Sequence, residues 1–100
     1  MDDLVQKVWD WFDEKGLNDP VMQMVKVSEE VGELSSEIAR GHRDTPEVKD
    51  AIGDSFVTLI GMCHHLDQDP KECLEMAYNT IKDRKGKVIN NSFVKDENKK

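Results

Sequence analysis

The chain has 100 residues, of which 37% are hydrophobic and 35% charged, and its formal net charge at pH 7 is −7. This size fits one domain, and the balance fits a soluble protein for which the cytoplasm is the default location. No stretch reads as a signal peptide or a membrane span, so no membrane partner is expected. The acidity argues against nucleic acid as a partner, because nucleic-acid-binding surfaces are usually basic.

Prolines and glycines divide the chain into helical segments. Each proline follows a residue able to cap a helix N-terminus, in the pairs Asp19-Pro20, Thr45-Pro46 and Asp69-Pro70. Glycines stand where helices are expected to stop, at Gly16, Gly41 and Gly86. These marks predict four helices, over residues 2–15, 20–40, 46–66 and 70–85.

Apolar residues recur within these segments at helical spacing. In segment 20–40 the stripe is Met24, Val27, Val31, Leu34 and Ile38. In segment 46–66 it is Val48, Ile52, Phe56, Leu59, Cys63 and Leu66. We expect these stripes to form the core of an all-α, four-helix bundle-like fold. From Ser55 to Cys63 the helix is apolar or small on nearly every side, which predicts a homodimer or homotetramer that covers it.

The residues after Gly86 lack the helical spacing of the earlier segments. We expect residues 1–87 to form the helical domain and residues 88–100 to form a short extended arm that ends in a disordered tail. The arm can dock through its apolar residues, which are Val88, Ile89, Phe93 and Val94.

Acidic residues gather at two places in the helical segments. Glu30 and Glu33 are three residues apart, on a stripe that also holds Gln23, Lys26 and Glu37. Asp50 and Asp54 share a face of the next helix, where Asp54 directly precedes the apolar run. Like charges so placed destabilise a helix, and a divalent cation would reverse this; carboxylate oxygens suit Mg²⁺ or Mn²⁺. Gly32 and Gly53 lie beside these acids, which suggests space for a helix crossing or a ligand.

The segment Glu29-Glu30-Val31-Gly32-Glu33, followed later by Gly53-Asp54 and an apolar run, resembles the MazG-like all-α nucleoside triphosphate pyrophosphatases. The signature of that family is E-E-x-x-E, a variable gap and then E-x-x-D. The first half matches fully, whereas Ala51 stands where the second-half glutamate would fall.

The resemblance implies Mg²⁺-dependent hydrolysis of nucleoside triphosphates to the monophosphate and pyrophosphate. It implies Glu30, Glu33 and Asp54 as metal ligands, with Asp50 as a weaker fourth and Glu29 as a ligand or an orienting group. A carboxylate not fully committed to metal, Glu33 or Glu30, could accept the proton of the attacking water. House-cleaning of aberrant nucleotides and control of deoxynucleotide pools are both compatible with this reading.

Further residues are candidates for substrate binding. Lys82, Arg84 and Asn79 could clamp phosphates, and Lys26 and Gln23 could assist; a cationic helix C-terminus is the structural alternative for the first group. Trp9 is the aromatic residue we would select to stack on a base, although aromatics at helical spacing are more often core. His64 and His65 are expected at a surface or a helix end.

Two other functions were weighed against the enzyme. A di-iron carboxylate bundle needs E-x-x-H pairs on its helices, and none of His42, His64 and His65 has a glutamate three residues before it. A non-catalytic or degenerate helical module for nucleotide binding or interaction stays open, because Ala51 removes a family acid. The preferred base and sugar do not follow from the sequence.

Overall fold

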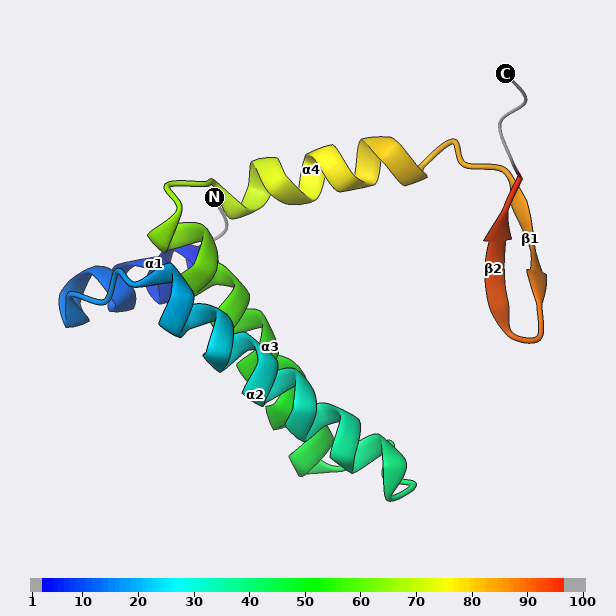
Figure 1. Cartoon of the computed structure of the whole chain (residues 1–100), viewed down its shortest axis with the longest axis horizontal. Coiled ribbons are helices and arrows are strands. Elements are labelled where there is room, and N and C mark those ends of the chain that lie inside the picture. The colour runs from blue at the N-terminus through cyan, green and yellow to red at the C-terminus, as the bar shows by residue number, and fades with distance from the viewer. Residues whose placement is uncertain (1–2, 97–100) are drawn as a thin grey trace. The chain divides into compact units, whose positions relative to one another are not determined.

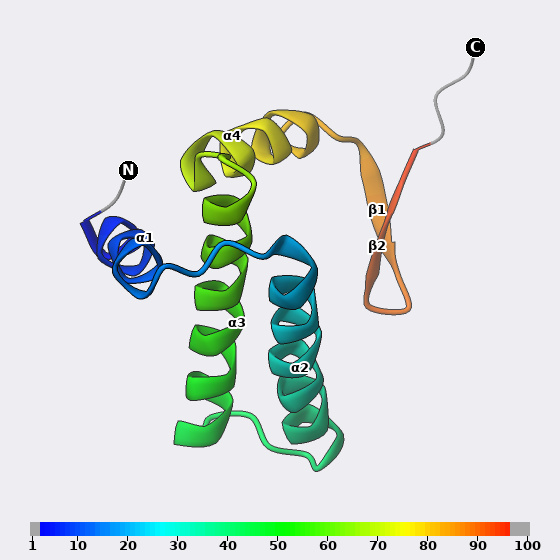
Figure 2. The same ribbon diagram turned by 60° about the vertical axis from the view of Figure 1, so that its left-hand side comes forward.

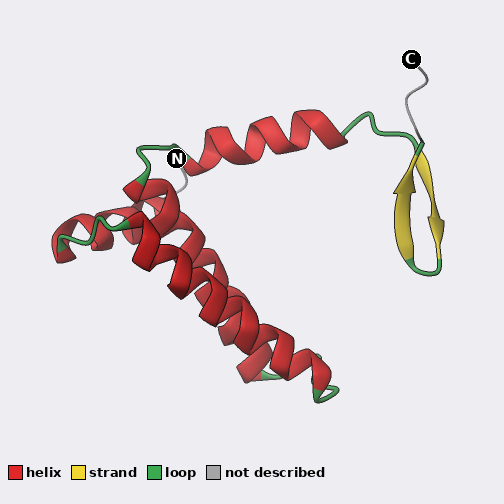
Figure 3. Cartoon of the chain, in the orientation of Figure 1, coloured by secondary structure: helices red, strands yellow, loops and turns green. Residues whose placement is uncertain are grey.

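The computed structural model describes residues 3–96. The chain forms two compact units, Met1–Pro70 and Lys71–Lys100. The elements in chain order are α1 (Asp3–Lys15), α2 (Pro20–Ala39), α3 (Pro46–His65), α4 (Pro70–Ile81), β1 (Gly86–Ile89) and β2 (Ser92–Lys95) (Figures 1 and 3). A mostly helical fold with four helices is thereby confirmed. Within residues 3–96, no helix is long and apolar enough to cross a membrane.

The capping signals at Asp19, Thr45, Gly16 and Gly41 act as the sequence predicts. Asp19 Oδ1 accepts hydrogen bonds from the backbone N–H of Val21 at 3.0 Å and of Met22 at 3.3 Å. Thr45 Oγ1 accepts one from the N–H of Val48 at 3.1 Å. These bonds satisfy N–H groups that have no partner inside the helix. Gly16 and Gly41 take φ angles of +66° and +85°, the left-handed conformation that ends helices.

The first unit is built on the pair α2 and α3, which lie side by side and antiparallel, while α1 packs on α3 (Figure 2). The residues of α2 on the packed face are Gln23, Val27, Glu30, Leu34 and Glu37, all buried or half-buried. The buried residues of α3 are Val48, Ala51, Ser55, Thr58 and Gly61.

This packing corrects the predicted core. The expected stripe of α3 lies largely outside it, since Ile52, Phe56 and Leu59 are exposed. Met24 and Val31 of α2 are exposed in the same way. Val27 and Val48 of the predicted stripes are buried as expected, and Leu34 is half-buried. The other side chains on the packed face are mostly small or polar.

Small residues are selected here because the helices approach closely. A Cβ at Gly61 would collide with the Phe12 ring and with Gln23 Nε2. The hydroxyls in the interface need no outside partner, because Ser55 Oγ donates to Ala51 O at 2.9 Å and Thr58 Oγ1 to Ser55 O at 2.8 Å. Gly32 and Gly53 face open space, so the helix crossing expected beside the acids occurs at Gly61 instead.

The second unit contains α4 and a β-hairpin. The helix ends at Ile81, four residues before the expected end, and Gly86 opens β1 instead of stopping a helix. Asn90 and Asn91 have φ angles of +51° and +63°, which suit a tight two-residue turn between antiparallel strands. This turn sets a register in which Gly86 pairs with Lys95, so the chain must already be extended at Gly86.

The expected extended arm therefore corresponds to most of this hairpin. The described structure begins at residue 3, so the predicted helix start at residue 2 lies outside it. Residues 97–100 of the expected disordered tail also lie outside the described residues.

We expect Gly61→Ala to destabilise the protein by about 1–3 kcal/mol, because the new methyl group must displace Phe12 or Gln23. Gly53→Ala in the same helix is the matched control, and it should stabilise the protein by up to about 1 kcal/mol because its methyl group meets nothing. Urea unfolding of the two variants measures the difference. Equal effects would contradict close approach at Gly61.

Candidate metal centre

Three carboxylates from α2 and α3 come together in the first unit. Glu30, Glu33 and Asp54 each offer an oxygen, and these oxygens all lie within 4.8 Å of one another. Glu30 and Glu33 are neighbours because residues three apart share a helix face. Asp54 joins them because α3 runs alongside α2.

Glu30 has the most demanding environment of the three. It lies on the packed stripe of α2, and its Oε2 atom is buried without a hydrogen-bond partner. Burial raises the pKa of its carboxyl above the ordinary value of 4.5, and the charges of Glu33 and Asp54 raise that pKa further. The site therefore holds negative charge that the described side chains do not neutralise.

Glu37, two turns further along the same stripe, is an acid whose charge is neutralised by ion pairs. Its carboxylate contacts His42 Nδ1 at 2.8 Å and Arg40 Nη1 at 3.5 Å. Within residues 3–96, Glu30, Glu33 and Asp54 have no ion pair of this kind. Glu30 and Glu37 both lie on the packed face of α2. They differ in that Glu37 has cationic partners and Glu30 has none among the described residues.

The donor set fits a hard divalent cation. Mg²⁺ prefers carboxylate oxygens, and two oxygens on opposite sides of the ion lie about 4.2 Å apart. Three carboxylate oxygens within 4.8 Å of one another are compatible with that spacing. A cation would also give the buried Oε2 atom of Glu30 the partner that it lacks.

The other predicted ligands lie outside this cluster. Asp50 is exposed on α3, and the Glu29 carboxylate pairs with Lys26 Nζ at 3.4 Å. Ala51, where the motif of the resemblance would have a glutamate, is buried and carries only a methyl group.

Two candidate substrate-binding residues of the first unit make structural contacts. Gln23 is buried and donates from Nε2 to the carbonyl oxygen of Thr58 at 2.9 Å, which ties α2 to α3. The Trp9 ring packs edge-on against the His64 ring, with 5.0 Å between centroids.

The remaining candidates belong to the second unit. Asn79 lies on α4, whereas Lys82 and Arg84 follow the end of that helix and were expected on it. All three side chains are exposed. Asn79 and Lys82 were predicted to share a helix face, but Lys82 lies just beyond the end of α4. Its N–H still donates a helix-like hydrogen bond to Tyr78 O at 2.8 Å.

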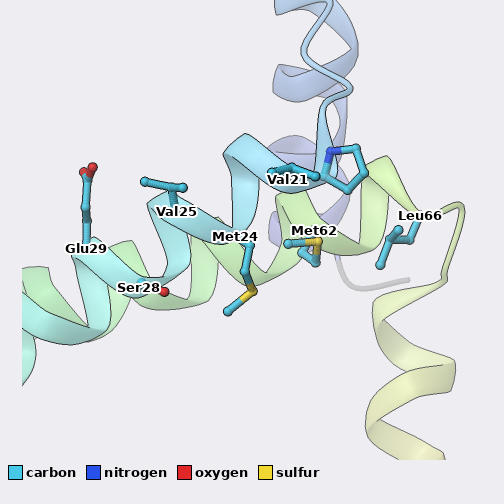
Figure 4. A pocket seen from close by; sticks show the side chains of 8 residues that line it. Val21, Met24, Val25, Ser28, Glu29, Met62 and Leu66 are labelled. Carbon is cyan, nitrogen blue, oxygen red and sulfur yellow. The ribbon is translucent and has the colours of Figure 1, made fainter.

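The first unit has an apolar groove, and one of its lining residues directly precedes Glu30 in the sequence (Figure 4). Its lining comes from the first half of α2 and the end of α3: Pro20, Val21, Met24, Val25, Ser28, Glu29, Met62 and Leu66. Glu29 is the last lining residue along α2, and it directly precedes Glu30.

Sequence reasoning missed a second polar cluster, at the end of α3. His64 Nε2 contacts Asp13 Oδ1 of α1 at 2.5 Å, and His64 Nδ1 contacts His65 Nδ1 at 3.0 Å. Asp13 and His64 are 51 residues apart, so no local pattern links them. Both histidines stand in the last turn of their helix, as expected, but are half-buried.

We expect Glu30→Gln to stabilise the metal-free protein at pH 7 by roughly 0.5–1 kcal/mol, because it removes a charge repelled by its neighbours. The folded protein holds the Glu30 proton more tightly than the unfolded chain does. Wild-type stability should therefore rise as the pH falls from 7 towards 4.5, and the advantage of Glu30→Gln should shrink. Urea unfolding with chelator tests this, with Asp50→Asn as the exposed control; equal pH dependence in wild type and Glu30→Gln would contradict it.

Comparison with known proteins gives one informative likeness. An uncharacterized 18.2 kDa protein in the rep-hol intergenic region of Haemophilus phage HP1 (strain HP1c1) is 33% identical to this chain over 69 residues. The matched stretch covers 64% of this chain and 41% of the phage protein, so the chain spans about two fifths of that relative. No family model and no solved structure matches the chain.

Proposed function

We propose that the protein hydrolyses nucleoside or deoxynucleoside triphosphates to the monophosphate and pyrophosphate, with Mg²⁺ held by Glu30, Glu33 and Asp54. The observation that carries this proposal is the buried, unpartnered Oε2 atom of Glu30 beside two further carboxylates. The family resemblance of the Glu29–Glu33 segment supplies the reaction. House-cleaning of nucleotide pools is the role that this activity would serve.

The carboxylates divide the work according to their exposure. All three would hold the ion; Glu30 and Asp54 are half-buried, whereas Glu33 is exposed, so one of its oxygens can hold the ion while the other reaches a water molecule. Bound Mg²⁺ would neutralise triphosphate charge and acidify a water ligand. Glu33 accepts the proton of the water that attacks the α-phosphorus, and pyrophosphate leaves with the bonding electrons of the broken P–O bond.

The apolar groove supports binding of the nucleoside. It begins beside Glu29, one residue from the proposed ligand Glu30, and it carries the flexible thioethers of Met24 and Met62. Methionine sulfur makes favourable contacts with aromatic rings and adapts to their shape. We place the base in this groove, with the phosphates directed to the carboxylates.

Glu30→Gln and Asp54→Asn should each lower Mg²⁺-dependent pyrophosphate release by about 100-fold or more, because each removes a charged ligand. Asp50→Asn, an exposed acid of the same helix outside the cluster, should stay within about threefold of wild type. The assay measures pyrophosphate from a panel of ribo- and deoxynucleoside triphosphates, with Mg²⁺ and with chelator.

Failure has two distinguishable forms. If the wild type binds nucleotide with Mg²⁺ but turns over no triphosphate, the chain is the non-catalytic nucleotide-binding module, and the acid missing at Ala51 is the reason. If Mg²⁺ neither raises the melting temperature nor supports nucleotide binding, the carboxylate cluster is not a metal site.

We further propose that a second copy of the chain covers the outer face of α3. Its residues Ile52, Phe56 and Leu59 follow one helical stripe and are 41%, 63% and 48% exposed. Such a contiguous apolar stripe is typical of a surface that a partner covers. Dimer and tetramer are both compatible with this face.

Phe56→Asp should convert the oligomer to a monomer, because a charge would then lie inside an apolar interface. Light scattering coupled to size-exclusion chromatography measures the mass. Asp50→Lys, at an exposed position about 120° around the helix from Phe56, is the control and should leave the mass unchanged. A monomeric wild type would refute this interface while leaving the hydrolase proposal standing.

A further inference from the structure

Helix α1 is held to the rest of the first unit by few groups. Phe12 is its one buried residue in the described range, with 3% of its surface exposed. A 13-residue helix is marginal by itself in water, so α1 depends on its contacts with α3. Its polar tie is the contact between Asp13 and His64, 2.5 Å from Oδ1 to Nε2.

His64 and His65 continue that tie along α3. Their Nδ1 atoms are 3.0 Å apart, and the Phe12 ring lies 5.9 Å from the His64 ring and 5.5 Å from the His65 ring, between centroids. Trp9 packs edge-on against His64. The two imidazoles therefore form the surface of α3 against which Trp9 and Phe12 of α1 pack.

The positions of the hydrogen atoms follow from these contacts. Asp13 is a carboxylate and accepts, so His64 Nε2 carries a hydrogen. The contact between the two Nδ1 atoms needs one hydrogen and one lone pair. It forms when either ring is cationic and the other neutral with a lone pair on Nδ1, or when both rings are neutral and His65 carries its hydrogen on Nδ1. With both rings cationic, both Nδ1 atoms carry hydrogens and face each other.

We propose that Asp13, His64 and His65 form an acid-sensitive clasp between α1 and α3, which opens when both imidazoles are protonated. A proton on His64 alone leaves the clasp closed, because it makes the bond to Asp13 charge-assisted. A second proton breaks the bond between the rings and places two positive charges side by side. Helix α1 then separates from α3, and the surface of α3 that Phe12 covers becomes exposed.

The groups that face the clasp act on the charge of His65 in both directions. Burial lowers the pKa of His65 below 6.5, the positive charge of His64 lowers it further, and Asp19 at the start of α2 opposes both effects. The group that faces His64 from α1 is Asp13. A lowered folded-state pKa means that protonation of His65 costs stability as the pH falls below 6.5.

The sequence provides a probe of α1 alone, because both tryptophans, Trp9 and Trp11, belong to this helix. In a Trp11→Phe background, acrylamide quenching measures how accessible Trp9 is. Between pH 8 and pH 5 the quenching constant should rise at least about twofold and return when the pH is restored, as expected for local opening. Far-UV circular dichroism should report that α2 and α3 remain helical.

His65→Gln should abolish the rise, because glutamine fills the position and cannot take up a charge. His42→Gln is the matched control, since the third histidine of the chain pairs with Glu37 and not with α1; it should behave as the wild type does. Hydrogen exchange of α1 amides in the unmodified protein, corrected for intrinsic rates, should report the same opening.

Three results would overturn the clasp. The first is unchanged Trp9 accessibility and α1 exchange between pH 8 and pH 5. The second is a rise in His65→Gln equal to that of the wild type. The third is loss of the rise in His42→Gln, which would assign the pH dependence to the other end of the unit.

Discussion

The contact between α2 and α3 combines a few aliphatic residues such as Val27 and Val48 with many small and polar side chains, and the candidate site exists because of it. Ala51, Ser55 and Gly61 keep the helices close enough for Asp54 to meet Glu30 and Glu33. Larger residues on that face would separate the carboxylates. The same closeness leaves Glu30 on a packed surface, where an unpartnered charge is costly in the absence of a cation.

Large apolar residues lie on the opposite faces as a consequence. In an isolated small domain this arrangement contributes little hydrophobic stabilisation, since Phe56 and Leu59 leave much of their apolar surface in water after folding. It becomes favourable if association of copies supplies the burial that one chain lacks. The proposed function and the proposed self-association therefore depend on the same choice of residues at the α2–α3 contact.

Much of the fold could be predicted from local signals. Asp19 and Thr45 cap helices where expected, because a capping bond joins residues only two or three apart. The buried faces could not be predicted, since a helical period does not say which of two stripes meets the neighbouring helix. The end of α4 differs from the prediction because a glycine after a helical segment indicates a helix stop, whereas Gly86 is the first residue of a strand that pairs with Lys95.

The candidate site divides in the same way. The spacing of Glu30 and Glu33 predicts their proximity within one helix, and the position of Asp54 before an apolar run indicates that it is drawn inward. The exclusion of Asp50 depends on how α3 is rotated against α2, which no motif encodes. Asp13 and His64 meet only through the docking of α1, so spacing could not reveal them.

Gly61 of α3 is in contact with both α1 and α2. The Phe12 ring and the Gln23 amide both occupy the space where its side chain would be, and Gln23 lies on the same face of α2 as Glu30. Seven residues, about 10 Å of helix, separate the two. A helix is stiff over that length, so we expect a larger residue at Gly61 that displaces Gln23 to shift Glu30 relative to Asp54 as well.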